Sequence, residues 1–296
     1  MVTETLYADN QPIVKFSSLL TTKTNEMAYR KKHIHCSKNL RDQTNYILPI
    51  TTINKHFTLY HQNIRGLGEK TSELIGSILP KLPHVICVTE HHLKEQEIEN
   101  LSIDHYTFGS KFCRQKLKHG GTCIFVHESL AFTNIDLKNF CIEQGIEICA
   151  IKINLPTAFI YIICIYRSPV GNFLHFIKGI DTILNRLYKP NMEIIICGDI
   201  NINCLEENCN KRQQLDALLA TYNLISTIRF PTRSLNGSSS AIDNIFIDIS
   251  HCGKYIVAPF INGLSDHDGQ IIKLEKINMQ KQTHEIRTIR NFNKYS

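Results

Sequence analysis

The chain has 296 residues, of which 43% are hydrophobic and 20% are charged, enough for one large globular domain with a substantial core. Its formal charge of +6 comes from the ends: residues 1–55 hold eight Lys or Arg against four Asp or Glu, and residues 276–296 hold five against one. Between them lie 20 basic and 22 acidic residues, which excludes a strongly basic central domain.

Residues 1–55 are polar, with scattered apolar positions and no sustained period, which predicts a basic extension without a stable fold. From residue 56 onward, apolar segments of strand and helix period follow one another. Strands are predicted at 57–61, 84–89, 147–154, 158–166, 194–197, 242–249 and 270–274. Helices are predicted from Thr71 or Ser72 to about Leu79, and at 173–187 and 211–222.

The connections between these elements are also predicted. The first strand, helix and second strand predict a βαβ-like unit, and strands 147–154 and 158–166 predict a hairpin. A Lys/Arg-rich loop at 111–119 precedes the apolar segment 120–127. Residues 230–240 are predicted to be a polar loop. The chain becomes basic and polar again after Glu275, so the predicted domains are 1–55, 56–275 and 276–296.

The 11 cysteines form no Cys-x-x-Cys pair, and several lie inside apolar runs, as small buried hydrophobes do. This usage predicts a reduced intracellular chain without a disulfide framework. The N-terminus is acidic and polar, unlike a secretory signal. The longest apolar run, 158–166, is far shorter than the roughly 20 residues that cross a bilayer. We therefore expect a protein that is neither secreted nor bound to a membrane.

Polar side chains recur where the predicted strands end: Asn63, Glu90, Tyr166, Asp199, Asn201, Asp243, Asp266 and His267. Carboxylates gathered in one place repel unless a cation lies among them, and hard oxygen donors select Mg²⁺, or Mn²⁺ in its place. A metal beside a carboxylate that orients water and an imidazolium would hydrolyse a phosphodiester. The alternative is that each residue is an ordinary turn former.

Seven motifs occur in the order typical of one family. They are Gln62-Asn63-Ile64-Arg65-Gly66-Leu67, Thr89-Glu90, Tyr166-Arg167-Ser168-Pro169, Gly198-Asp199-Ile200-Asn201, Pro231-Thr232-Arg233, Ile242-Asp243-Asn244-Ile245-Phe246 and Ser265-Asp266-His267. Over residues 56–275 the set resembles the endonuclease/exonuclease/phosphatase superfamily. That resemblance implies an α/β, DNase I-like fold: a four-layer sandwich of two packed, mainly antiparallel mixed sheets flanked by helices.

Within the superfamily, the Tyr-Arg-Ser-Pro, Pro-Thr-Arg and Ile-Asp-Asn-Ile-Phe motifs are most similar to the apurinic-like endonuclease domain of non-LTR (LINE-type) retrotransposons. This similarity implies a Mg²⁺-dependent endonuclease that nicks one strand of DNA. The basic tail resembles the start of a linker to a reverse transcriptase, so we expect a truncated or separately retained endonuclease module. Access to DNA implies the nucleus, and no feature predicts an obligate protein partner.

The resemblance also implies roles for the matching residues. Asn63 and Glu90 would belong to the metal site, with Glu90 as the principal ligand, and Asp266 would assist the metal or the proton balance. Asp199 would position or activate water, with Asn201 holding the phosphate. His267 would contact the phosphate, and Asp243 would orient its ring. Tyr166 would support the phosphate or the leaving oxygen, and Arg167 would be a neighbouring substrate contact.

One position departs from the family pattern. Abasic-site endonucleases of the superfamily carry Asp two residues after the motif Asn, where this chain has Arg65. Arg65 is therefore either a phosphate contact or a surface salt-bridge residue. Two readings compete with a DNA endonuclease: a phosphatase or exonuclease of the same superfamily, and a non-catalytic nucleic-acid-binding remnant. The loops 111–119 and 234–240 are candidates for reading DNA shape.

Overall fold

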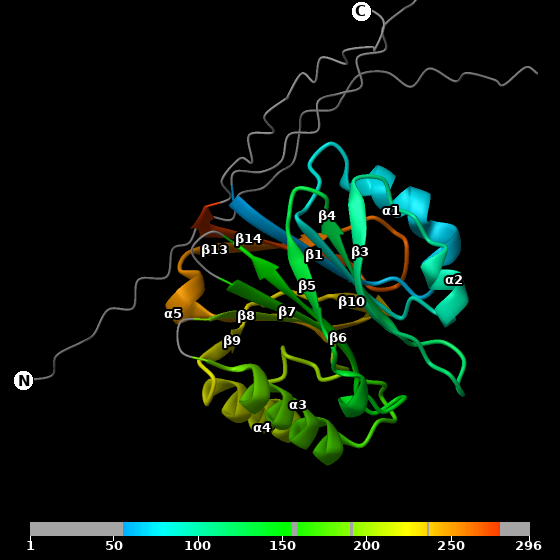
Figure 1. Cartoon of the computed structure of the whole chain (residues 1–296). Coiled ribbons are helices and arrows are strands. Elements are labelled where there is room, and N and C mark those ends of the chain that lie inside the picture. Colours follow the sequence, from blue (N-terminus) through cyan, green and yellow to red (C-terminus); the bar gives the residue numbers. More distant parts are fainter. Residues whose placement is uncertain (1–55, 156–158, 190–191, 236, 279–296) are drawn as a thin grey trace, which may run out of the picture. The chain divides into compact units, whose positions relative to one another are not determined.

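The computed structural model describes residues 56–155, 159–189, 192–235 and 237–278 (Figure 1). All of them belong to one compact unit. The predicted N-terminal extension, 1–55, lies outside the described residues, as does the C-terminal tail after Asn278. The last strand of the domain continues through Asn278, past the predicted domain boundary at residue 275, and Ile277 on it is buried.

The first sheet has six strands in the order β13-β14-β1-β2-β4-β3. Its strands are β1 (His56–Asn63), β2 (Val85–Thr89), β3 (Tyr106–Phe112), β4 (Thr122–His127), β13 (Tyr255–Phe260) and β14 (Gly269–Asn278). Only β1 and β2 are parallel, joined by the predicted helix α1 (Thr71–Ile78). This helix and α2 (Glu95–Glu99) lie on the outer side of the sheet (Figure 1).

The second sheet also has six strands, in the order β5-β6-β7-β8-β12-β9. Its strands are β5 (Phe132–Ile135), β6 (Glu147–Asn154), β7 (Phe159–Tyr166), β8 (Glu193–Asp199), β9 (Leu224–Ser226) and β12 (Asp243–Asp248). The predicted hairpin is β6–β7, and only β7 and β8 are parallel. Helices α3 (Phe173–Leu187) and α4 (Asn210–Ala220) pack together on the outer side (Figure 1). The predicted four-layer α/β sandwich is confirmed.

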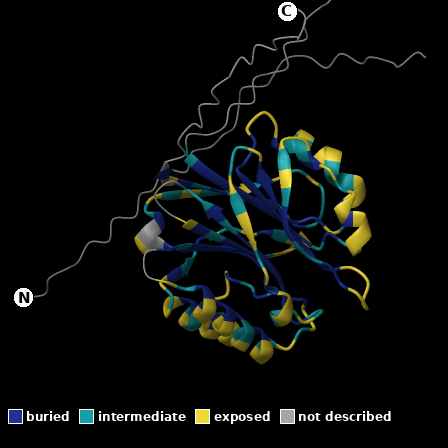
Figure 2. Ribbon diagram, viewed as in Figure 1, coloured by how far each residue is buried: buried dark blue, intermediate teal, exposed yellow. Residues whose placement is uncertain are grey.

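The domain has two separate hydrophobic cores, and successive side chains of one strand contribute to them in turn. On β2, Val85 and Cys87 join the core between the sheets, whereas Ile86 and Val88 join the core beneath α1. This alternation follows from the two-residue period of a strand, which sends neighbouring side chains to opposite faces. Dark blue strands inside yellow-faced helices show the same layering in Figure 2. The helices α1, α3 and α4 turn buried apolar side chains toward the sheets they cover.

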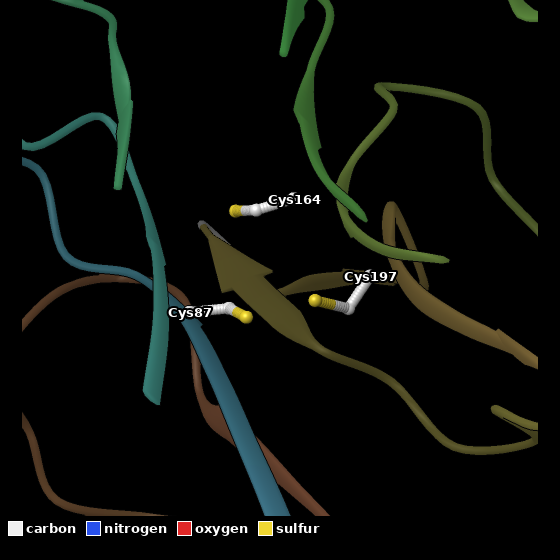
Figure 3. A group of neighbouring side chains, drawn as sticks. All are labelled: Cys87, Cys164 and Cys197. Carbon is white, nitrogen blue, oxygen red and sulfur yellow. The ribbon is translucent and has the colours of Figure 1, made fainter. Parts of the chain in front are cut away.

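Three thiols meet between the two sheets, one each from Cys87 on β2, Cys164 on β7 and Cys197 on β8 (Figure 3). Their sulfur atoms lie within 4.8 Å of one another, and all three residues are fully buried. Burial raises the pKa of the Cys87 and Cys164 thiols. These cysteines therefore serve as small apolar side chains in the inter-sheet core, as their sequence context predicts.

Five strands of the two six-stranded sheets were not predicted: the edge strands β3, β5, β9 and β13, and the inner strand β4, which lies in the segment 120–127 that was noted only as apolar. An edge strand is covered on fewer sides, so it lacks the continuous apolar run that marks a central strand. The predicted polar loop at 230–240 is also wrong in part, because β10 (Arg233–Leu235) and β11 (Ser238–Ser240) pair as a small ribbon. The remaining elements are α5 (Ile249–Cys252) and two 3₁₀ turns, Gly68–Lys70 and Lys138–Phe140.

A buried histidine gives the fold a pH dependence. The Nδ1 atom of His84 accepts a hydrogen bond from the Thr58 backbone N–H at 3.1 Å, which requires the neutral ring. Burial, with a further contribution from His127, lowers the pKa of His84 to about 4. Between about pH 6.5 and pH 4 the unfolded chain therefore binds a proton that the folded chain does not. The free energy of unfolding should fall with falling pH across this window.

The expected slope for this one group approaches about 1.4 kcal/mol per pH unit. Urea unfolding at several pH values should show a shallower slope in His84→Asn, whose Oδ1 can accept the same N–H without titrating. His105→Asn is the matched control, because the His105 side chain is 46% exposed. Equal slopes in the parent and His84→Asn would contradict a neutral buried His84.

Candidate active site

Asn63 joins the ends of the two sheets. It ends β1, opposite Thr89 in the parallel register with β2, and its side chain is fully buried. Its Nδ2 atom donates to Glu90 Oε1 at 2.9 Å and to Asp199 Oδ2 at 2.8 Å. Glu90 follows β2 in the first sheet, whereas Asp199 ends β8 in the second. One amide group therefore holds together an acid from each sheet.

Glu90 lies in the left-handed backbone region, with φ of 52°. Its carbonyl oxygen accepts from the Gly66 N–H at 2.8 Å, which fixes the turn after β2 onto the turn after β1. Burial raises the pKa of Glu90, but hydrogen bonds from His92, Asn63 and Tyr166 outweigh it and lower the pKa to about 2. Glu90 is therefore an ionised carboxylate at neutral pH. His92, which donates to Oε2 at 3.1 Å, had no predicted role.

Asp199 and Asp243 are directly opposite each other on the antiparallel strands β8 and β12. Both are buried, at 1% and 0% exposure. Burial and then the charge of Asp243 raise the pKa of Asp199 to about 8, although His267, Asn63 and the Asn201 N–H lower it. Two negative charges at facing positions of a sheet repel each other. Because this repulsion raises its pKa, Asp199 can exchange a proton near neutral pH.

His267 pairs with Asp243 through Nδ1 and Oδ2 at 2.8 Å. The same Oδ2 accepts from the Thr232 hydroxyl at 2.8 Å, a contact that the sequence analysis did not predict. Burial lowers the pKa of His267, but the charge of Asp243, its hydrogen bond and the charges of Asp199 and Asp266 raise it to about 9. The ring is thus an imidazolium whose orientation Asp243 fixes.

Tyr166 ends β7 and lies beside Asp199 in the parallel register with β8. Its hydroxyl lies close enough to Glu90 for the carboxylate to affect its pKa. Burial and the charges of Glu90 and Asp199 raise the pKa of this hydroxyl, so Tyr166 remains a proton donor at neutral pH. The structure therefore brings a neutral donor next to the carboxylates.

Arg167, which is predicted to contact substrate, is bound to backbone groups of the protein itself. Arg167 is 1% exposed, and its guanidinium donates to the backbone carbonyls of Ile200, Ser168, Gly171 and Asn201. Asn201 returns the contact by donating Nδ2 to the Arg167 carbonyl at 2.8 Å. A guanidinium satisfies several carbonyls at once because its donors form a planar fork. Arg167 therefore fixes the turn that carries Asn201, which has φ of 50°.

Arg167→Lys should lower the free energy of unfolding by about 2 kcal/mol, because a lysine leaves some of these buried carbonyls without donors. Urea unfolding measures the loss, and Arg186→Lys on an exposed position of α3 is the control. A substrate contact predicts a different outcome: unchanged stability with a weaker salt dependence of DNA binding.

Asp266, which is predicted to assist the metal or the proton balance, lies between two arginines. Its Oδ1 accepts from Arg65 Nη1 at 2.9 Å, and its Oδ2 accepts from Arg233 Nε at 2.9 Å and pairs with Nη2 at 2.8 Å. Burial raises the pKa of Asp266, but these two arginines outweigh it and lower the pKa to about 2. Both oxygens are engaged by guanidinium groups, so the carboxylate is neutralised without a metal.

The donor set at the site fits a hard divalent cation. Asn63 Oδ1 and Asp243 Oδ1 are buried acceptors without a hydrogen-bond partner in the described part of the chain. Buried acceptors are rarely left unpaired in native proteins. Asn63 Oδ1 belongs to the residue that bonds the ionised Glu90, so a neutral and a charged oxygen donor lie together. Asp199, Asp243 and His267 also bring ligand atoms within 4.8 Å, but Asp243 and His267 already pair with each other.

Residues 160–271 match the protein family described as Endonuclease-reverse transcriptase. No curated protein sequence matches the chain. Among solved structures, the endonuclease domain of TRAS1, a telomere-specific non-LTR retrotransposon, has a TM-score of 0.59 at 14% identity, covering 74% of this chain and 98% of its own. An AP endonuclease from Archaeoglobus fulgidus has a TM-score of 0.57 at 12% identity, and the match covers 74% of this chain and 99% of that protein. A 3′-5′ exonuclease from Neisseria meningitidis has a TM-score of 0.54 at 13% identity, and the match covers 74% of this chain and 99% of that protein.

These comparisons confirm the resemblance inferred from the motifs. The chain has the DNase I-like fold of the endonuclease/exonuclease/phosphatase superfamily, and part of it matches an endonuclease family linked to reverse transcriptases. The matched segment runs from β7 to β14 and therefore includes Asp199, Asp243 and His267. At identities of 12% to 14%, the solved structures establish the fold alone.

Proposed function

Because this domain has the fold of the endonuclease/exonuclease/phosphatase superfamily, we propose that the protein is a divalent-metal-dependent DNA endonuclease of retrotransposon origin that nicks one strand. The observation that carries the proposal is the convergence of Asn63 and Glu90 from the first sheet with Asp199 and the Asp243–His267 pair at one site. Superfamily enzymes hydrolyse phosphate esters, and these groups are the ones that such a reaction uses.

Asn63 Oδ1 and the Glu90 carboxylate would hold the cation. Their oxygen donors favour Mg²⁺, with Mn²⁺ as an alternative. When bound, such an ion supplies a Lewis acid that polarises a phosphoryl oxygen. The low pKa of Glu90 supports this role, because the carboxylate is already ionised before a metal arrives.

The remaining residues would act directly on the substrate. Asp199, whose pKa is raised to about 8, would orient the attacking water and accept its proton. The His267 imidazolium would donate to a phosphate oxygen through Nε2, since Asp243 holds Nδ1. Tyr166 would donate its hydroxyl proton to the leaving oxygen, as its raised pKa keeps it protonated. Asn201 would bind the phosphate with its remaining amide donor.

DNA is the proposed substrate because the matched family combines an endonuclease with a reverse transcriptase, and TRAS1 is a non-LTR retrotransposon. The loops 111–119 and 234–240 remain predictions for reading DNA shape. Action on chromosomal DNA would place the protein in the nucleus, which a fluorescent fusion in cells would test. No helix in the described part of the chain is long and apolar enough to span a membrane.

A plasmid assay tests the function. Purified protein with Mg²⁺ should convert supercoiled plasmid to open circles, and a chelator should stop the conversion. The alternative activity, that of an exonuclease or phosphatase, is favoured by one observation: the same fold occurs in the Neisseria 3′-5′ exonuclease. Mononucleotides released from linear DNA, without open circles, would support that alternative. Full retention of nicking in chelator would contradict the proposal.

A further inference from the structure

Arg65 occupies a fixed position beside the proposed metal site. It follows β1 by two residues and has φ of 49°, a left-handed conformation that non-glycine residues seldom adopt. The turn is held by the Gly66 N–H, which donates to the Glu90 carbonyl at 2.8 Å, and by Lys70 Nζ, which donates to the Ile64 carbonyl at 2.7 Å. The backbone of Arg65 is therefore tied to that of Glu90.

The Arg65 guanidinium lies in the field of two carboxylates. Nη1 donates to Asp266 Oδ1 at 2.9 Å, and Glu90 also interacts electrostatically with the same guanidinium. Glu90 belongs to the proposed metal site, whereas Asp266 interacts with His267 on the other side. Arg65 thus places a fixed positive charge where two acidic groups would otherwise repel each other or attract a cation.

Arg233 completes the neutralisation of Asp266. Its Nε and Nη2 atoms both contact Oδ2, and its backbone forms an isolated β-bridge with His267. The segment is held by the neighbouring Thr232, which is fully buried and bonds Asp243. Asp266 therefore faces two positive charges, and each of its oxygens already contacts a guanidinium group.

We propose that Arg65 replaces a second metal ion, so that this active site binds one divalent cation, at Asn63 and Glu90. Asp266 then serves to anchor Arg65 and Arg233 and does not ligate metal. The Arg65 side chain is 49% exposed and that of Arg233 is 28% exposed, so both can reach a phosphate while keeping one contact to Asp266. The proposal rests on the proposed function only in assuming that Asn63 and Glu90 bind a cation.

Calorimetric titration of the full chain with Mn²⁺ tests the proposal without any measurement of activity. The parent should bind one ion. Glu90→Gln should weaken that binding at least about 100-fold, because it removes the charged ligand. Asp266→Asn should leave the affinity within about threefold, because Asp266 does not contact the ion. Two ions of similar affinity in the parent, or loss of binding in Asp266→Asn, would overturn the proposal.

The variant Arg65→Asp tests whether a second metal site can be created. It removes the fixed charge and adds a carboxylate near Glu90 and Asp266, at a backbone conformation that Asp tolerates. This variant should bind two Mn²⁺ ions, and Arg65→Gln, which adds no ligand charge, is its matched control. A single ion in Arg65→Asp, with a melting temperature showing that it is folded, would overturn the exclusion by Arg65.

The outcomes separate the two proposals. A parent that nicks plasmid and binds two ions keeps the endonuclease function and overturns the inference. A parent that binds no Mn²⁺ overturns both, because the shared assumption of a cation at Asn63 and Glu90 then fails.

Discussion

Asp199→Asn should reduce plasmid nicking by about 10³-fold, the scale of a lost general base. Asparagine has nearly the shape of aspartate, so the fold and the cross-strand position opposite Asp243 should persist. It cannot accept a proton from water, and its amide nitrogen would face either the Asn63 amide or the Asn201 N–H, which both now donate to Asp199. Initial rates of open-circle formation measure the effect.

Two comparisons make this result specific. Asp216→Asn changes a half-exposed carboxyl on α4 and should nick at the parent rate. Asp199→Asn should also melt within a few degrees of the parent, which separates lost chemistry from lost folding. Nicking within threefold of the parent would remove Asp199 from the mechanism.

Glu147→Gln should cost about 3–5 kcal/mol of stability, because it leaves a buried arginine without its partner charge. Glu147 is fully buried, and Arg114, which pairs with it through Nε at 2.6 Å, is 6% exposed. Glu147 also accepts from the N–H groups of Gly121 and Gln144, both at 2.7 Å. Burial raises the pKa of Glu147, while these N–H groups and Arg114 lower it. Glutamine cannot accept from all of these donors.

Thermal unfolding should show the loss as a fall in melting temperature on the order of 10 °C. Arg212→Gln is the control: it breaks the i,i+4 pair with the half-exposed Asp216 and should cost no more than about 0.5 kcal/mol. Equal, small losses in both variants would show that the buried pair contributes little beyond a surface one.

Most of the central strands could be predicted, because their residues are buried on both faces. Residues 194–197 form an unbroken apolar run, and in the structure they are at most 2% exposed. The edge strand β5 could not, since only partly buried residues such as Phe132 face the core there. The ribbon β10–β11 is composed largely of serines, so no apolar period marks it.

Similar limits apply to the site. Asn63, Glu90, Asp199, Asp243 and His267 were predictable because each lies at or beside an end of an apolar strand and matches a family motif. Their convergence is observed, whereas their catalytic roles stay predictions.

The contacts that Arg167 and Asp266 make could not be predicted, because their partners are remote in the sequence or are backbone groups. Neither the carbonyl of Ile200 nor the guanidinium of Arg233 can be paired with them from motif spacing. His92 and Thr232 were missed because their hydrogen bonds to Glu90 and Asp243 depend on local turn geometry.

The rate of the proposed reaction should depend on how the two sheets are aligned, because the Asn63 amide bonds a residue from each. This amide donates one hydrogen bond to Glu90, which follows the first sheet, and one to Asp199 in the second sheet. A small slip of one sheet against the other would stretch one of these bonds while leaving both sheets intact. Substitutions deep in the interior should therefore slow the proposed reaction before they unfold the domain.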